Sequence, residues 1–495
     1  MKHRATKLFC MIALAATLLM YSCVEYTSVD YTQVEQEIFD EWMATNRPEL
    51  LDNYQSNGGY YIDLISAGDT SGRPLSDTIC WVAYDLTGYD LHGNVSITRN
   101  DVVAWQQGSF STATHYVPYF RYSDPDPDTE YEPLLECSQL AFSNELTIGD
   151  QKVLLYNGAE FVLYSPSSII TSEGTSGTGG YEGQFSLGTL PFVGKFKVTN
   201  VIYDPTEYEQ EIVDAFATDN GGLTINPDSL DDEDDEDETE ETSEDADQEV
   251  EDTNAWTNSV DSIGYVYINR TYTPNTEGES FNYNNPYVSK VPTSPYINGV
   301  AALDVKINAI LEELFSEDYD PDGEEVGEDG TATVWYIGRF LDGFIFDTNI
   351  AEVKDLINNT VDSTGTAISY TADSDSSSYI LSWYYTIPYM KYGQWSTIIS
   401  VSDYAYGYAG TNGDTTYSSS STSSYYDYYN YYNYYNNYYG YSSYYGNSYY
   451  DSSYYYNNSY YNDDTSTTTT TVTTEILPYT PLIFEIYIEA TDDDE

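Results

Sequence analysis

The spacing of apolar residues along this 495-residue chain predicts two amphipathic helices. The first covers residues 34–51, with Phe39, Trp42 and Met43 on one face and Pro48 near its end. The second covers residues 301–315, where apolar side chains recur every three or four positions: Leu303, Ile307, Ile310, Leu311 and Leu314. Between these helices, from residue 58 to about residue 205, short apolar runs alternate with glycine-rich turns, which is typical of strands.

Three later segments carry a more specific pattern. Residues 334–349 read VWYIGRFLDGFIFDTN, residues 379–407 read YILSWYYTIPYMKYGQWSTIISVSDYAYG, and residues 476–488 read ILPYTPLIFEIYI. In this order they resemble the FKBP-type peptidyl-prolyl cis-trans isomerase family. The first resembles its strand-turn-strand wall, the second its tryptophan-bearing helix and following strand, and the third its closing strand. The resemblance implies an α+β fold in which an antiparallel sheet wraps around a short helix.

The same resemblance implies a site for proline-containing polypeptides. Trp383 matches the floor under the proline ring, and Tyr336, Phe346 and Phe484 match its aromatic walls. The remaining matches are polar or flanking groups: the Ile380 N–H and the Tyr406 hydroxyl as donors to substrate carbonyls, Asp347 beside the rotating amide, and Ile476 as an apolar contact. Residues 350–366 lengthen the connection after Asp347, so the wall arginine of some members has no clear counterpart.

Isomerisation of this kind needs no cofactor and no metal. Rotation about a peptide bond costs ~18–20 kcal/mol, and a site that prefers the twisted amide lowers this barrier by differential binding. With only three histidines in the chain, no histidine-rich metal site is predicted. Residues 318–329 resemble an EF-hand loop only superficially and predict an acidic turn.

The earlier part of the chain repeats the pattern in weaker form. Residues 82–95 resemble the strand-turn-strand motif, residues 140–155 the helix, turn and strand, and residues 190–201 the closing strand. The site residues are absent, because Leu86 stands in place of the wall tyrosine, Ser96 and Ile97 replace the Phe-Asp pair, and Gln139 is the best match for the tryptophan. This repeat is therefore expected to be structural or partner-binding.

Together these patterns predict two FKBP-like domains in tandem, with other segments around them. We expect a lipoprotein signal peptide at 1–22, a tether at 23–30, a degenerate FKBP-like domain at 31–205, an acidic linker at 206–254 and an isomerase domain at 255–491. An insertion rich in Tyr, Ser and Asn interrupts the last domain at 414–474.

The N-terminus has the features of an export signal. Basic residues at positions 2, 4 and 7 precede an apolar run, and the small residue Ser22 stands before Cys23. This predicts lipidation of Cys23 and tethering to a membrane of a bacterial cell envelope, with ordinary secretory cleavage as the alternative. Which membrane, and which face of it, stays open.

The charge of the chain excludes one class of partner. A formal net charge of −66 repels nucleic acid, because phosphate binding needs Lys and Arg, and also repels anionic membrane surfaces. Contact with a membrane is therefore expected through the lipid anchor alone. Residues 228–252 concentrate Asp, Glu, Ser and Thr, which predicts an extended linker, with weak calcium binding as a lesser alternative.

Two features keep alternatives open. Cys80 and Cys137 form either a disulfide, which an oxidising compartment permits, or two buried thiols. The Tyr-rich insertion is either a tolerated surface expansion or a flap that captures substrate or adheres to partners.

The functional hypothesis is a peptidyl-prolyl isomerase that assists the folding of exported proteins. The alternative is a non-catalytic, lipid-anchored binding protein or chaperone, or an adhesive surface protein. The sequence predicts neither the client proteins nor the oligomeric state.

Overall fold

A computed structural model describes the chain in segments. They are residues 31–123, 136–167, 191–220, 223–224, 256–258, 266–269, 281–283, 285–316, 320, 323–361, 363–372, 378–411, 415–416, 471–472 and 474–490. The predicted signal peptide and tether lie outside the described residues, as do most of the linker and of the Tyr-rich insertion. None of the helices within the described segments combines the length and the apolar character needed to cross a membrane.

The described residues divide into two compact units. Unit 1 lies within Met1–Ile97, Arg121–Thr175 and Ser186–Val201, and unit 2 lies within Thr98–Phe120, Ser176–Phe185 and Ile202–Glu495. Both contain antiparallel strand pairs and helices, which confirms the predicted α+β class. The segment 98–120 belongs to unit 2, whereas the sequence predicts it within the first domain, 31–205.

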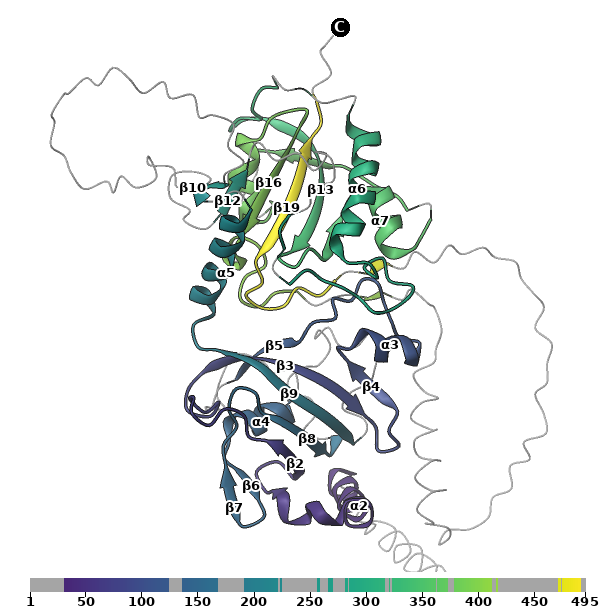
Figure 1. Cartoon of the computed structure of the whole chain (residues 1–495), viewed down its shortest axis with the longest axis vertical. Helices are drawn as coiled ribbons and strands as arrows, with labels where there is room; N and C mark the ends of the chain where they lie inside the picture. The colour runs from purple at the N-terminus through teal and green to yellow at the C-terminus, as the bar shows by residue number, and fades with distance from the viewer. Residues whose placement is uncertain are drawn as a thin grey trace, which may run out of the picture. The chain divides into compact units, whose positions relative to one another are not determined.

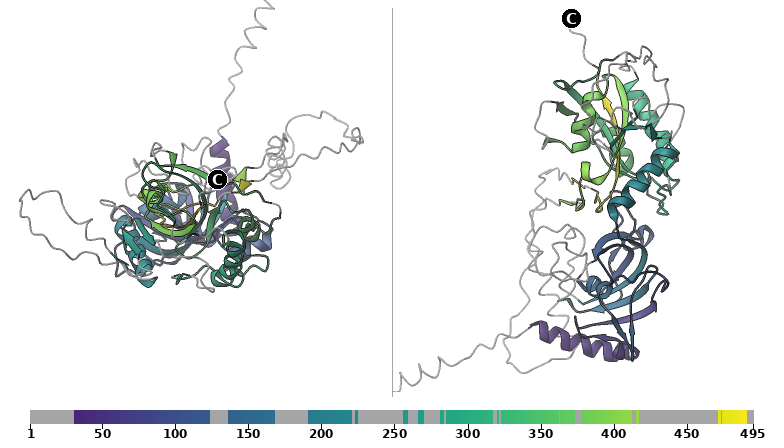
Figure 2. Two further views of the ribbon diagram at one scale, coloured as in Figure 1. Left: turned by 90° about the horizontal axis from the view of Figure 1, so that it is seen from above. Right: turned by 90° about the vertical axis from the view of Figure 1, so that its left-hand side faces the viewer.

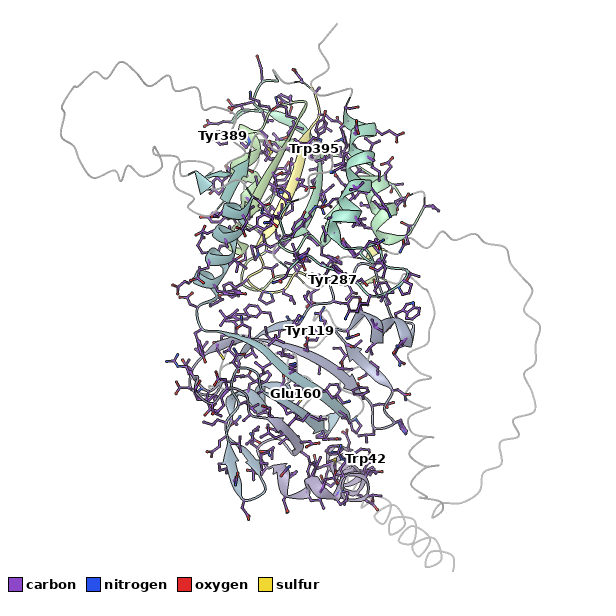
Figure 3. All side chains as sticks on the ribbon, in the orientation of Figure 1. Trp42, Tyr119, Glu160, Tyr287, Tyr389 and Trp395 are labelled. Carbon is purple, nitrogen blue, oxygen red and sulfur yellow. The ribbon has the colours of Figure 1, made fainter. Side chains whose placement is uncertain are left out.

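The elements from the N-terminus to β9 are as follows: α2 (Tyr31–Asn46), η1 (Pro48–Asn53), β1 (Tyr54–Gln55), β2 (Tyr60–Ser66), β3 (Cys80–Tyr89), β4 (Val95–Thr98), α3 (Asp101–Gln107), β5 (Tyr119–Ser123), α4 (Glu136–Ser143), β6 (Leu146–Ile148), β7 (Gln151–Val153), β8 (Glu160–Ser165) and β9 (Phe192–Ile202). The predicted helix at 34–51 is confirmed, but its α-helical part ends at Asn46. Arg47 leaves the helical region with φ −138° because a residue before proline is disfavoured there. Phe39 and Met43 are fully buried in unit 1. Trp42, labelled in Figure 3, packs against Tyr164 with ring centroids 6.4 Å apart.

The remaining elements are α5 (Pro205–Asp219), β10 (Leu223–Thr224), β11 (Trp256–Asn258), β12 (Val266–Asn269), α6 (Val300–Phe315), β13 (Thr331–Phe340), β14 (Ile345–Thr348), α7 (Ala351–Asn358), β15 (Ile368–Thr371), α8 (Leu381–Thr386), η5 (Ile387–Tyr389), β16 (Gln394–Ser400), η6 (Ser402–Tyr404), β17 (Thr415–Thr416), β18 (Thr471–Val472) and β19 (Leu482–Ile488). The predicted helix at 301–315 is confirmed as α6, with Leu303, Ile307 and Leu311 buried and Leu314 exposed.

The two units share one strand order. The shared part of the sheet is β2-β8-β9-β3-β4 in unit 1, with β5 also paired to β3, and β12-β16-β19-β13-β14 in unit 2, with β15 also paired to β13. Beyond it, β1 adds to β2, and β11 and β10 add to β12. The helices recur at the same points of the chain, since α3 follows β4 and α7 follows β14, the last strand of each path, and α4 and α8 precede β8 and β16. The weak repeat in the sequence therefore corresponds to a repeated topology.

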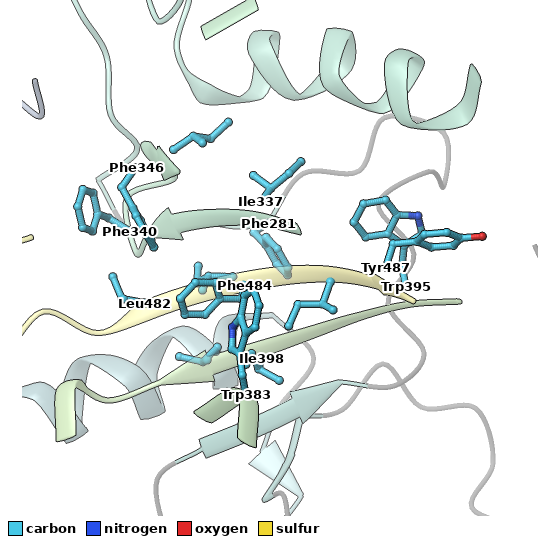
Figure 4. Close-up of a cluster of buried hydrophobic side chains, with 14 of the residues drawn as sticks. Phe281, Ile337, Phe340, Phe346, Trp383, Trp395, Ile398, Leu482, Phe484 and Tyr487 are labelled. Atoms are coloured by element: carbon cyan, nitrogen blue, oxygen red, sulfur yellow. The ribbon is translucent and has the colours of Figure 1, made fainter. Parts of the chain in front are cut away.

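Strand β19 occupies the middle of the unit 2 sheet and is buried on both faces (Figures 1 and 2). Alternate residues of a strand point to opposite faces. On one face, Phe484 meets Trp383 of α8 with ring centroids 5.5 Å apart. On the other face, Tyr487 meets Phe315 of α6 at 4.6 Å. One sheet thus carries two separate aromatic groups, which Figure 4 shows apart along β19.

Helix α5 corrects the start of the predicted linker at 206–254. Pro205 occupies the first turn of the helix, and the Asp204 side chain accepts a hydrogen bond from the Glu207 N–H as the N-cap. Val213, Phe216 and Ala217, at helical spacing, are buried in the core of unit 2. Residues 205–219 therefore belong to the folded unit 2.

Cys80 and Cys137 are both buried free thiols, which decides between the two readings of the sequence. Burial raises the pKa of the Cys80 thiol to about 12, so this thiol stays protonated at neutral pH and reacts slowly.

Alkylation without a reductant tests the state of these cysteines. We expect peptides containing Cys80 and Cys137 to be unmodified after iodoacetamide treatment of the native chain and fully carbamidomethylated after treatment in denaturant, as read by mass spectrometry. A peptide pair linked through both cysteines would contradict the free-thiol assignment.

Candidate functional site

Five of the eight predicted site residues come together on one face of the unit 2 sheet. Tyr336 lies on β13, Phe346 and Asp347 on β14, Trp383 on α8 and Phe484 on β19. Phe484 is central, with its ring centroid 5.5 Å from Trp383, 5.7 Å from Phe346 and 6.4 Å from Tyr336. Tyr336 and Trp383 meet edge to face at 5.0 Å. We call these four rings the site cluster.

The hairpin of β13 and β14 positions three of these residues. Its turn contains Gly343 with φ +85°, a left-handed conformation that favours glycine. The strand pairing shifts register between Gly338 and Arg339, and the Phe346 ring lies directly over Gly338. A Cβ at Gly338 would stand 2.6 Å from the Phe346 ring, so this ring position requires glycine there.

Asn349 joins the end of the hairpin to β13, a role that the sequence motif does not predict. Its side chain accepts from the Tyr336 N–H at 2.8 Å and donates to the Val334 carbonyl at 2.9 Å. The Thr348 hydroxyl donates to the Tyr336 carbonyl at 2.6 Å. The backbone of Tyr336 is therefore fixed from two side chains. The signal available in the sequence was the polar run from Asp347 to Asn349 at the end of β14.

The start of α8 places Trp383 and the predicted backbone donor. Ile380 is the N-cap in extended conformation, and its carbonyl accepts from the N–H groups of Trp383 and Tyr384 at 3.0 and 3.1 Å. Within the described segments, the Ile380 N–H donates no hydrogen bond. The predicted role requires this, because the N–H must be able to donate to a substrate carbonyl. Trp383 is 5% exposed, and its indole N–H has no partner among the described residues.

The polar side of the site is built around Asp347. The Tyr336 hydroxyl donates to Oδ2 of this exposed carboxylate. Burial raises the pKa of the Tyr336 hydroxyl, and the Asp347 charge raises it further. Burial and the Asp347 charge likewise raise the pKa of Tyr406, which lies in the turn after η6. Both hydroxyls therefore stay protonated donors, and Tyr406 keeps an exposed fraction of 37%.

Ile476 lies at the base of the Tyr-rich insertion. Thr411 and Ile476 exchange backbone hydrogen bonds of 2.8 and 3.0 Å, which joins the chain before and after the insertion. Ile476 is 4% exposed and belongs to the core of unit 2. Ile380 packs against the same core and is partly buried. The roles assigned to all eight residues stay predictions.

Unit 1 has no equivalent of the site cluster at the matching positions. Leu86 is buried, Ile97 is buried, and the Gln139 side chain donates to the Ser143 hydroxyl at 2.9 Å. Three rings of unit 1 nevertheless pack together on the elements that correspond to those of the site cluster: Tyr84 of β3 lies 5.5 Å from Phe142 of α4 and 5.7 Å from Phe196 of β9. At the sequence-matched positions 86, 97 and 139, unit 1 has no aromatic ring.

No family model matches the chain, and no curated protein matches it. Solved structures similar to it include the three FKBP domains of wheat FKBP73, at 9% identity and TM-score 0.21, covering 89% of this chain and 97% of that one. They also include FkpA from Escherichia coli, at 12% identity and TM-score 0.21, covering 41% and 71%. A peptidyl-prolyl cis-trans isomerase from Pseudomonas syringae has 20% identity and TM-score 0.16, covering 34% and 66%. TM-scores of this size carry no weight for fold or function.

Proposed function

We propose that unit 2 is an FKBP-like peptidyl-prolyl cis-trans isomerase that acts on X-Pro bonds. In the same proposal the chain holds two FKBP-like domains in tandem, and the first has lost its site. The observation that carries the proposal is the site cluster with the Asp347 carboxylate at its edge. Four rings from three strands and one helix pack together, with Phe484 in contact with the other three, and they occur along the chain in the order of the family's motifs.

The chemistry fits this arrangement because the reaction breaks no bond. A planar amide becomes twisted in the transition state and loses the resonance that stiffens its C–N bond. Aromatic walls that hold the proline ring away from water favour the twisted form, which has less charge separation. Fixed donors such as the Ile380 N–H and the Tyr406 hydroxyl orient the neighbouring carbonyls, so the site binds the transition state more tightly than the planar ground state.

The proposed clients are exported proteins at a bacterial cell envelope, where a lipid on Cys23 would tether the isomerase to a membrane. This part rests on the signal-like N-terminus alone. An exported isomerase has a kinetic task, because uncatalysed X-Pro isomerisation takes roughly 10–100 s and can limit folding.

A second candidate is a binding protein that holds unfolded chains without turnover. One observation favours it: Trp383, Phe484 and Phe346 are 5%, 2% and 9% exposed, as expected for rings that only pack a core. Substrate turnover separates the two candidates.

The deciding experiment measures isomerisation of a short peptide with an apolar residue before proline, using the full chain. We expect acceleration, and a roughly 10-fold to 100-fold lower kcat/KM for Trp383→Leu and for Asp347→Val, which corresponds to about 1.4–2.7 kcal/mol of transition-state stabilisation. Trp395→Leu is the matched control, since Trp395 is also buried at 4% exposure but packs against Tyr487 on the other face of the sheet. It should keep its activity per folded molecule.

Two outcomes would overturn the proposal. The first is a folded chain without acceleration, which would select the binding protein. The second is an equal loss of activity in Trp383→Leu and Trp395→Leu, which would show that only the core had been damaged.

A further inference from the structure

A buried carboxylate outside the site is joined to the turn that carries Tyr406. Glu209 of α5 is 2% exposed, although Glu is rarely buried without a partner. Its Oε1 accepts from the Ser402 N–H at 2.5 Å, and its Oε2 accepts from the Ser402 hydroxyl at 2.7 Å. Both partners lie within unit 2.

Ser402 also binds the residues on both sides of Tyr406. Its carbonyl accepts from the Ala405 N–H at 2.8 Å and from the Gly407 N–H at 2.7 Å. Gly407 has φ +69°, which favours glycine and closes the turn. All the backbone hydrogen-bonding groups of Ser402 and its hydroxyl are therefore engaged, and Tyr406 projects from between the two residues that Ser402 holds.

We infer that Glu209 is a positioning residue for the proposed isomerase site, and that α5 fixes the Tyr406 turn through the Glu209–Ser402 contact. The positioning role rests on the proposed function, whereas the Glu209–Ser402 contact is a feature of the structure. It also assigns a purpose to burying a carboxyl group on a helix whose Glu209 lies 193 residues before Ser402 in the chain.

The contact is sensitive to protonation. Burial raises the pKa of Glu209 to about 7. The two hydrogen bonds from Ser402 lower this pKa, and the charge of Asp403 raises it. Asp403 lies in the facing turn and is the other charged group that acts on Glu209 among the described residues. An opened turn would expose Glu209 and return its pKa toward 4.5. Protonation thus favours the closed turn, so this contribution is complete below about pH 4.5 and is lost as the pH rises through about 7.

Hydrogen exchange of the full chain tests the inference without any turnover. For peptides spanning residues 402–410 at pH 6, we expect Glu209→Ala to lower protection by about tenfold or more, as expected for lost hydrogen bonds to a carboxyl group. Glu209→Gln, which keeps the shape and an acceptor, should restore most of it. Glu211→Gln, an exposed position on the same helix, should have no effect. Wild-type protection should fall between pH 5 and pH 8, and Glu209→Gln should remove that change.

The outcomes separate the inference from the proposed function. Unchanged protection in Glu209→Ala overturns the inference, whatever the isomerase assay gives. If Glu209→Ala unfolds unit 2, peptides of β16 and β19 will lose protection too. In that case Ser402→Ala, which deletes one of the two hydrogen bonds, decides instead. A loss of protection confined to residues 402–410 supports the inference, and no loss overturns it. An inactive wild type with the predicted exchange pattern would reject the isomerase and keep the contact.

In an active chain, the same variants give a second readout. Glu209→Ala should lower kcat/KM because Tyr406 is no longer held, and Glu209→Gln should recover it. An Ala variant with lost protection and full activity would overturn the positioning role.

Discussion

Replacing Arg339 by alanine is expected to lower the free energy of unfolding of unit 2 by about 3–5 kcal/mol, the range for removing one partner of a buried ion pair. The Arg339 side chain is 2% exposed, with Nη1 2.9 Å from Asp304 Oδ1 of α6 and Nε 3.4 Å from Glu485 Oε1 of β19. Without the guanidinium, two carboxylates would stay buried side by side. Burial alone would lower the pKa of Arg339, but the two carboxylates outweigh it and raise that pKa well above its ordinary value.

A triple variant distinguishes a lost pair from a lost packing volume. Arg339→Met combined with Asp304→Leu and Glu485→Leu removes every charge of the network, and such replacements are often neutral or stabilising. Native-state hydrogen exchange of β13 and β19 in increasing denaturant measures unfolding of unit 2 separately from unit 1. If Arg339→Ala and the triple variant prove equally unstable, the cost comes from packing and not from unpaired charge.

This network shows where sequence reasoning reaches its limit. Arg339 stands inside the motif at 334–349, but its partners lie in α6, which precedes β13 in the chain, and in the last strand, β19. Nothing in the local pattern pairs an arginine with two distant carboxylates. The site cluster was predictable because each of its residues lies at a fixed place in a short motif, such as a hairpin or a helix start.

Helix α5 was missed for a different reason. The acidic composition of residues 206–254 led us to read one continuous linker, although a start signal (Asp204 and Pro205) and an apolar stripe (Val213, Phe216 and Ala217) were present. Composition averaged over the whole stretch hid a helix at its beginning. The shared topology of the two units was predictable from the weak repeat, whereas the place of residues 98–120 in unit 2 depends on tertiary packing.

Replacing Phe484 by alanine is expected to destabilise unit 2 by about 3–5 kcal/mol and to abolish most isomerase activity per folded molecule. Phe484 is 2% exposed and contacts the three other rings of the site cluster, so its loss removes both packing and a wall of the site. Activity is measured as kcat/KM below the melting transition, and stability by the same exchange experiment.

Phe315 supplies the matched control for this change. It is 8% exposed, and its ring likewise contacts three aromatic residues, Tyr487 at 4.6 Å, Trp395 at 5.6 Å and Trp335 at 6.1 Å, but on the opposite face of the sheet. Phe315→Ala should lower the free energy of unfolding by a similar amount and leave the activity of the folded molecules unchanged, because β19 separates the rings around Phe315 from the site cluster. If both variants lose activity in proportion to stability, the site cluster is ordinary core, and the non-catalytic binding protein becomes the better account of unit 2.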